Sequence, residues 1–388
     1  MSVPSLSGKV AIVGVDESDQ IGVVPDKSAM QLQAEAARNA LRDAGLGVRD
    51  VDGLFTAGVS TTEVGEYLGI EPRYLDGTNV GGSSFVIHVG HAAAAIAAGL
   101  CQVALITHGQ SGRSRIGMPP RVSHPQLMAG QFEEPFGLPQ PVGAYALACS
   151  RHMHQYGTTS EQLAEIAVAT RAWAALNPRA LHRDPLTIAD VLASRWISYP
   201  FHLLDCCLVT DAGGAVVLTS LERARDCRTT PVRVLGFGEA HDHALISQMP
   251  YLTHGPARLS GPRAFAMAGM RCEDIDVAEI YDSFTYTVLL SLEDLGFCRK
   301  GEGGAFVSGQ RTAPGGVFPL NTSGGGLSYT HPGMFGIFTV IEAVRQLRHD
   351  YADQGRRQVA DAEVALAHGT GGVLSATGTL ILGRGGRS

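Results

Sequence analysis

The stretch AGLGVRDVD, residues 44–52, recurs without a gap as AGMRCEDID, residues 268–276. In both copies a helical pattern ends at a glycine, Gly45 or Gly269, and an aspartate-flanked turn leads into a strand. A second echo follows in the same order, because VALITHG (103–109) resembles VALAHG (364–369) less one residue. Two echoes in one order indicate a duplicated chain, each half reading strand, helix, strand, glycine-rich loop, helix, strand. That order predicts an α/β protein with buried sheets.

The duplication predicts two similar halves with a segment inserted between them. Residues 1–109 together with 198–230 form the expected N-terminal half, and residues 231–388 form the C-terminal half. Residues 110–197, richer in proline, histidine and polar side chains, form an inserted loop region that we expect to cover the site. Because no linker longer than a loop separates the halves, we expect them to pack together.

Periodicity within the halves predicts individual elements. The predicted strands are residues 9–15, 51–57, 103–107 and 211–218, and the predicted helices are residues 28–44, 89–98, 160–176, 188–194 and 262–268.

Composition excludes several classes of protein. The 388 residues are 45% hydrophobic and can bury a large core. Seven cysteines without a CxxC pair fit a reducing compartment and argue against a structural zinc site, so no metal is expected in this chain. A net charge of −7 without a basic stripe argues against nucleic acid as a partner. No membrane span and no signal peptide are recognisable, so we expect a cytoplasmic protein.

We expect the chemistry in VFPLNTSGGGLSYTHPGMFG, residues 317–336. Its glycines allow the backbone to approach a ligand closely, and a helical pattern begins after Pro332 and directs free N–H groups at the same spot. Tyr329 and His331, two residues apart, can both move protons. The alternative is a glycine-rich turn between two core elements. In the first half, Gly81–Ser84 is the counterpart of this loop, so two helix N-termini should face one site from opposite halves.

A family resemblance rests on four segments: LLDCCLVTDAGGAVVL (203–218), EIYDSFTYTVLLSLEDLGFCRKGEGGAFV (279–307), NTSGGGLSYTHPG (321–333) and AHGTGG (367–372). Through them the chain resembles the thiolase superfamily, and within it the sterol-carrier-type thiolase-like proteins. The resemblance implies the five-layered αβαβα thiolase fold, a coenzyme A thioester as substrate, and a dimer. The alanine-rich helix and the glycine loops also suggest apolar surface that a second copy would cover.

The chain departs from the thiolase pattern at its reactive positions. The family's nucleophilic cysteine belongs at one of positions 82 to 84, where this chain reads Gly-Ser-Ser. Tyr281 stands ahead of Asp282-Ser283-Phe284, where sterol-carrier thiolases have a histidine, and His368 falls at the family's third site. A serine hydroxyl needs a strong base beside it to act as a nucleophile, so cleavage through an acyl-enzyme is unsupported.

Loss of the cysteine and gain of tyrosines resemble the thiolase-like aldolases that shorten steroid side chains. The resemblance implies retro-aldol cleavage of a β-hydroxyacyl-CoA carrying a tertiary alcohol, to a ketone and a shorter acyl-CoA. It assigns proton steps to Tyr281 and Tyr329 and oxyanion stabilisation to His331, with His368 in a catalytic loop. Substrate-binding positions are then Ser83, Gly325, Gly326 and Gly371. It also implies a small partner protein with an OB fold and a zinc ribbon that binds acyl-CoA.

Several alternatives stay open at this point. Tyr281 can be a core tyrosine, His368 a turn residue, and Ser83 only the N-cap of its helix, which is the favoured interpretation. A thiolase that condenses or cleaves through Ser83 and a catalytically silent subunit are the competing functions.

Overall fold

The computed structural model of the chain describes residues 6–117 and 126–385. The first five residues, which carry part of the signal-peptide expectation, and residues 118–125 of the expected insertion lie outside the described residues. The strands are β1 (Val10–Glu17), β2 (Gly53–Thr56), β3 (Tyr74–Asp76), β4 (Val103–Ser111), β5 (Trp196–Ser198), β6 (Phe201–His202), β7 (Asp211–Ser220), β8 (Val232–His241), β9 (Val277–Ile280), β10 (Val364–Gly371) and β11 (Ala376–Arg384). The α-helices are α1 (Ala29–Ala44), α2 (Thr61–Leu68), α3 (Ser84–Ala97), α4 (Met128–Phe132), α5 (Val142–Tyr156), α6 (Ser160–Leu176), α7 (Ile188–Ala193), α8 (Leu221–Ala224), α9 (Ala257–Ala268), α10 (Thr285–Leu295), α11 (Gly303–Val307) and α12 (Gly336–Arg348).

Across the described residues, nine strands form one sheet in the order β3-β2-β4-β7-β1-β8-β11-β10-β9. The two halves of this sheet repeat one pattern. In the first, β2 is parallel to β4, and β4, β7 and β1 follow as antiparallel neighbours. In the second, β9 is parallel to β10, and β10, β11 and β8 follow in the same way. The half-sheets meet where β1 pairs with β8 through Ala11 with Arg233 and Ile12 with Val232. The predicted duplication is confirmed by this topology.

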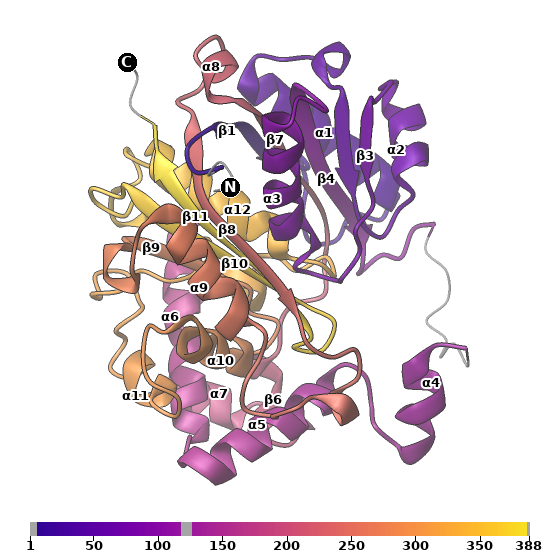
Figure 1. The fold of residues 1–388 in the computed structure, drawn as a ribbon. Coiled ribbons are helices and arrows are strands. Elements are labelled where there is room, and N and C mark those ends of the chain that lie inside the picture. Colours follow the sequence, from indigo (N-terminus) through magenta and orange to yellow (C-terminus); the bar gives the residue numbers. More distant parts are fainter. Residues whose placement is uncertain (1–5, 118–125, 386–388) are drawn as a thin grey trace.

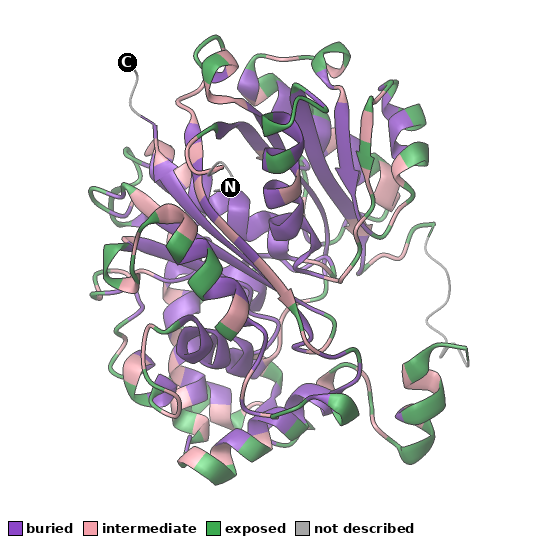
Figure 2. Ribbon diagram, in the orientation of Figure 1, coloured by how far each residue is buried: buried purple, intermediate pink, exposed green. Residues whose placement is uncertain are grey.

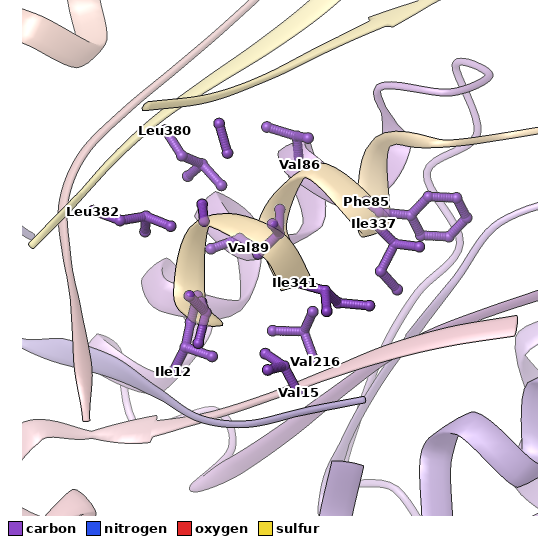
Figure 3. Close-up of a cluster of buried hydrophobic side chains, with 14 of the residues drawn as sticks. Ile12, Val15, Phe85, Val86, Val89, Val216, Ile337, Ile341, Leu380 and Leu382 are labelled. Carbon is purple, nitrogen blue, oxygen red and sulfur yellow. The ribbon is translucent and has the colours of Figure 1, made fainter. Parts of the chain in front are cut away.

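Helices cover both faces of each half-sheet and produce the five layers. Helix α1 packs on β1, β4 and β7, and α9 packs on β8 and β11, each on an outer face. Helices α3 and α12 contact each other and strands of both half-sheets, so they form the middle layer (Figure 1). Figure 3 shows this layer, where Val86 and Val89 of α3 and Ile341 of α12 meet strand residues such as Ile12 and Leu380. The αβαβα fold is therefore as predicted.

The central position of α3 explains its composition. Its alanines Ala92, Ala93 and Ala95 are buried within the chain. Most of the helix is buried, and Figure 2 shows the burial of each element in colour. Small side chains let the helix approach both half-sheets closely. This helix therefore does not supply the apolar surface that the sequence suggested a second copy would cover.

Local signals fixed most element ends. Ser28 and Gln31 form a capping box at the start of α1, and Gly45 ends it in the left-handed conformation, as Gly269 ends α9. Helix α9 begins at Ala257, earlier than predicted, because Pro262 lies inside the helix and not at its start.

The segment between β4 and β5 packs against the C-terminal half. Helix α6 contacts α10, α11 and the turn Gly325–Tyr329 (Figure 1). The ring of Tyr145 in α5 lies 4.7 Å, centroid to centroid, from that of Phe284. Helix α5 was not predicted from the sequence. No helix among the described residues is both long and apolar enough to cross a membrane.

Candidate active site

The glycine triplet forms a π-helical turn, η6 (Gly325–Tyr329), that is held by one carboxylate. Asp282 accepts hydrogen bonds from the backbone N–H groups of Gly326 at 2.6 Å and Leu327 at 3.1 Å. A Cβ at Gly325 would lie 2.1 Å from Asp282 Oδ2, and the φ of Gly325 is +57°, so this position requires glycine. Burial, partly offset by these N–H groups, raises the pKa of Asp282 to about 7. Asp282 thus shapes the loop as a structural acceptor.

The next residues place His331 against the N-terminal half. The His331 N–H donates to Thr210 Oγ1 at 2.9 Å, and the Thr210 N–H donates to the His331 carbonyl at 3.2 Å. Thr210 directly precedes β7, so two hydrogen bonds fix the backbone of His331 relative to the first half-sheet.

Tyr281 emerges from the end of β9 and meets His331. The Tyr281 hydroxyl lies 2.8 Å from His331 Nε2 and 3.4 Å from the carbonyl oxygen of Gly333. Burial raises the pKa of Tyr281 well above its usual value and lowers that of His331 to about 4. At neutral pH the pair is therefore a protonated phenol and a neutral imidazole that share one hydrogen bond.

The three positions where the family's cysteine could fall have different environments. A Cβ at Gly82 would lie 2.0 Å from Tyr281 Cε1, so the tyrosine ring rests directly on Gly82. Ser83 Oγ is buried beside Gly371 and has no hydrogen-bond partner among residues 6–117 and 126–385. Ser84 Oγ accepts from the Val80 N–H at 3.0 Å and donates to the Gly81 carbonyl at 2.6 Å. Ser83 occupies the N-cap position of α3, as the sequence favoured, but its side chain makes no capping hydrogen bond.

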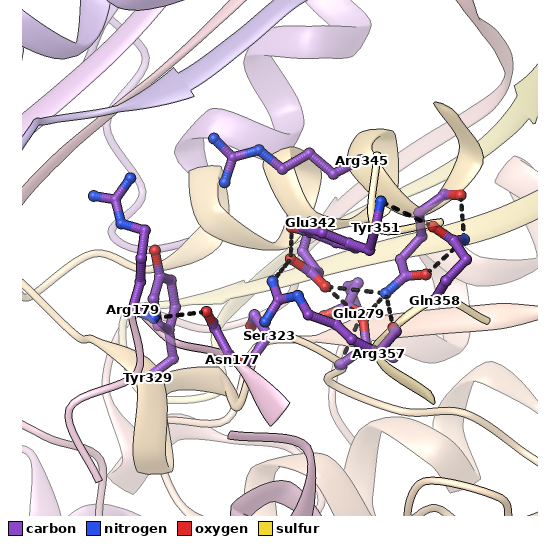
Figure 4. Close-up of polar contacts among 12 residues, drawn as sticks. Asn177, Arg179, Glu279, Ser323, Tyr329, Glu342, Arg345, Tyr351, Arg357 and Gln358 are labelled. Carbon is purple, nitrogen blue, oxygen red and sulfur yellow. Dashed lines mark hydrogen bonds and ion pairs between the residues drawn. The ribbon is translucent and has the colours of Figure 1, made fainter. Parts of the chain in front are cut away.

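Tyr329 points away from this pair. Its hydroxyl donates to the Glu17 carboxylate, which also pairs with Arg345 at 3.2 Å and Arg179 at 3.4 Å. Figure 4 shows the Tyr329 ring beside Arg179, in a group of polar side chains. Burial and the Glu17 charge raise the pKa of Tyr329. The structure thus brings Tyr281 and His331 together and leaves the Tyr329 hydroxyl with Glu17.

His368 also lies apart from the pair. It is opposite Ile280 in the β9–β10 register, and both face the outer layer, where His368 Nδ1 lies 2.9 Å from Thr379 Oγ1. Tyr281, the next residue after Ile280, faces the middle layer, because neighbouring strand residues alternate between faces.

His108 on β4 faces the middle layer instead, and the sequence did not single it out. Its ring centroid lies 4.6 Å from that of Phe85, and it is buried. The echo of VALITHG in VALAHG, less one residue, aligned His108 with His368. The missing residue is the sequence signal that the two histidines face opposite sides of the sheet, since a shift of one position exchanges the two faces of a strand.

The chain is similar to known proteins over most of its length. Residues 238–384 match the family described as Thiolase C-terminal domain-like. A 17-hydroxy-3-oxo-4-pregnene-20-carboxyl-CoA lyase of Mycobacterium tuberculosis is 38% identical over 361 residues, covering 88% of this chain and 92% of that protein. A steroid side-chain-cleaving aldolase of Thermomonospora curvata is 37% identical over 358 residues, covering 88% of this chain and 91% of that protein. The solved structure named Ltp2-ChsH2(DUF35) aldolase superposes with a TM-score of 0.88 at 34% identity over 98% of both chains.

The duplicated five-layered fold and these relatives together define a carbon–carbon lyase of the thiolase type. The chain belongs to the thiolase superfamily, and within it to the aldolase-like members.

The described residues contain no cluster of three or more histidine, cysteine, aspartate or glutamate side chains able to hold a metal ion.

Proposed function

We propose that the protein cleaves a β-hydroxyacyl-CoA bearing a tertiary alcohol, derived from a steroid side chain, into a ketone and a shorter acyl-CoA. The observation that carries this proposal is the hydrogen bond between the Tyr281 hydroxyl and His331 Nε2. It places a proton donor and its acceptor at the end of a strand, where a thioester enolate formed by cleavage can be protonated at carbon.

The roles follow from the protonation states. Tyr281, kept neutral by burial, donates its proton to the α-carbon of the enolate. His331 orients the phenol through the hydrogen bond at Nε2 and exchanges protons with it. The first-turn N–H groups of α3, with its positive dipole end, stabilise the enolate oxygen. Glycine is needed at 326 and 371, because a Cβ at Gly326 would lie 3.1 Å from His331 Cδ2 and one at Gly371 would lie 1.9 Å from the Val80 carbonyl oxygen.

The serine-nucleophile alternative finds less support. Ser83 Oγ has no base in hydrogen-bond contact within the described part of the chain. Burial also raises the pKa of all seven cysteines, so a thiolate at this site has no source.

The test is product analysis with a panel of coenzyme A esters. A β-hydroxyacyl-CoA such as 17-hydroxy-3-oxo-4-pregnene-20-carboxyl-CoA should yield a ketone and propionyl-CoA, while β-ketoacyl-CoA esters should remain intact. Tyr281→Phe should reduce kcat by about 10²–10⁴-fold and His331→Ala by a comparable factor. Cleavage of the keto esters alone would assign the protein to the thiolases.

We further propose that the chain forms a homodimer in the cytoplasm and works with a small acyl-CoA-binding partner that has an OB fold and a zinc ribbon. Support comes from the structural relative, whose name joins Ltp2 with ChsH2. Any zinc then belongs to the partner. Sedimentation of the chain alone and after co-expression checks both points, and full activity of an isolated monomer would contradict both.

A further inference from the structure

The base that takes the hydroxyl proton is the open part of the mechanism proposed above. Tyr329 is directed at Glu17, and His331 Nε2 is bonded to Tyr281. Tyr281 itself is needed at the α-carbon. One more proton acceptor must therefore face the same space.

The end of β4 runs beside the loop that carries His331. Ser111 at the end of β4 pairs with Asp211 of β7. Thr210, the residue before Asp211, is hydrogen-bonded to both the N–H and the carbonyl group of His331. A Cβ at Gly112 would lie 3.2 Å from the Pro332 carbonyl oxygen, and one at Gly333 would lie 2.5 Å from Gln110 Oε1. The side chains on the inner face of β4 near its end therefore point toward His331 and Gly333.

His108 and Gln110 are those side chains, two residues apart on one face of the strand. His108 is 2% exposed, and neither of its ring nitrogens has a hydrogen-bond partner among the described residues; Gln110 Oε1 has none either. An unsatisfied buried polar group costs about 1–3 kcal/mol, so native proteins retain such groups chiefly where a ligand or water completes them. Phe85 packs against the ring and fixes its plane without using a nitrogen.

We propose that His108 is a catalytic residue of this site, the general base that accepts the proton of the substrate's tertiary hydroxyl. This proposal rests on the retro-aldolase function. The imidazole is neutral at physiological pH, because burial and then the neighbouring His331 lower the pKa of His108 to about 3. A neutral imidazole with both nitrogens free can hold one hydrogen bond and accept one proton.

The proton inventory closes within one turnover. The substrate O–H bond breaks, and its proton passes to a nitrogen of His108. The electron pair left on the oxygen forms the C=O bond of the ketone as the Cα–Cβ bond breaks. The electrons of the Cα–Cβ bond form the thioester enolate. The α-carbon takes the proton of Tyr281, and the proton on His108 returns to the phenolate through His331. The imidazolium exists beside the enolate formed in the same step, so the site gains no net charge.

A half-reaction separates this role from that of Tyr281. In D₂O, the Tyr281–His331 pair should exchange the α-hydrogens of propionyl-CoA without any hydroxyl group present. His108→Gln keeps a polar side chain of similar size but cannot accept a proton, so it should lower cleavage of the tertiary hydroxy ester by about 10²–10⁴-fold and leave exchange within about threefold of wild type. Tyr281→Phe should lose both reactions.

The matched control is His88→Gln. His88 is another fully buried histidine that packs against Phe85, with Nδ1 unpartnered among the described residues, but it bonds the Thr78 carbonyl at 2.9 Å. This variant should keep both reactions. Normal cleavage by His108→Gln would overturn the proposal, and equal loss of cleavage and exchange would show a general structural role instead. A wild-type protein that exchanges propionyl-CoA but cleaves no hydroxy ester would refute the retro-aldolase function itself.

Discussion

Gly82→Ala tests whether the Tyr281 ring position carries the activity. The added Cβ would lie 2.0 Å from Tyr281 Cε1 and 2.8 Å from both Tyr281 Cζ and the Thr370 carbonyl oxygen. Ordinary contact begins near 3.4 Å, so the ring must retreat by about 1.4 Å, and the 2.8 Å bond from its hydroxyl to His331 cannot survive that movement. Misplacement by about 1 Å can cost roughly 10²-fold in rate, and overpacking costs about 1–3 kcal/mol of stability.

The assay is ketone formation from the tertiary hydroxy ester, with thermal unfolding measured in parallel. Gly47→Ala serves as control, because its Cβ would meet nothing closer than Asp50 Oδ2 at 3.8 Å and its φ is −121°. The control should leave both rate and stability near wild type. If Gly82→Ala cleaves the ester within about threefold of the wild-type rate, the reasoning from the Tyr281 position is refuted.

Four further outcomes follow from the site. Tyr329→Phe should lower stability by about 1 kcal/mol and kcat by less than tenfold, since its hydroxyl serves Glu17; a loss as large as that of Tyr281→Phe would restore its catalytic assignment. Ser83→Ala should leave kcat unchanged, and a dead enzyme would return the serine mechanism. Iodoacetamide near pH 7.5 should not abolish turnover, because burial raises the pKa of every thiol; inactivation prevented by acyl-CoA would identify a reactive cysteine. Folding raises the pKa of Asp282 from 3.8 to about 7, so the folded protein binds this proton more tightly than the unfolded chain does. The wild type should therefore lose stability relative to Asp282→Asn as pH rises from about 4 to 7. Melting temperatures of the two proteins that change equally between pH 5 and pH 8 would contradict this.

The fold was predictable because its signals are local and repeated. The glycines that end α1 and α9, the capping box at Ser28 and the buried runs of β4 and β7 each act over a few residues. Duplication then shows each signal twice. Helix α5 was not predicted because it follows a segment rich in proline and glycine, residues 135–141, that suggests a loop.

The site was predictable only in part, because side-chain direction depends on register and on partners distant in sequence. Tyr281 and His331 meet as a pair only because β9 ends beside the loop after η6. The hydroxyl of Tyr329, two residues from His331, is instead bonded to the carboxylate of Glu17 on β1, a contact that no local sequence pattern indicates. His108 and His368 lie in similar sequence segments of the two halves. Because one segment is a residue shorter, His108 faces the middle layer and His368 faces an outer layer.

The bracing of the catalytic loop also bears on how the protein acquires activity. The loop belongs to the C-terminal half, but Glu17 and Thr210 of the N-terminal half hold it across separations of 312 and 121 residues. Closing such long loops is slow, and a nascent chain cannot form the Glu17 contact until Tyr329 has left the ribosome. In refolding experiments, circular dichroism should therefore recover before turnover does. Activity then requires both halves to be folded and joined, so a chain with only one half folded should form no enolate.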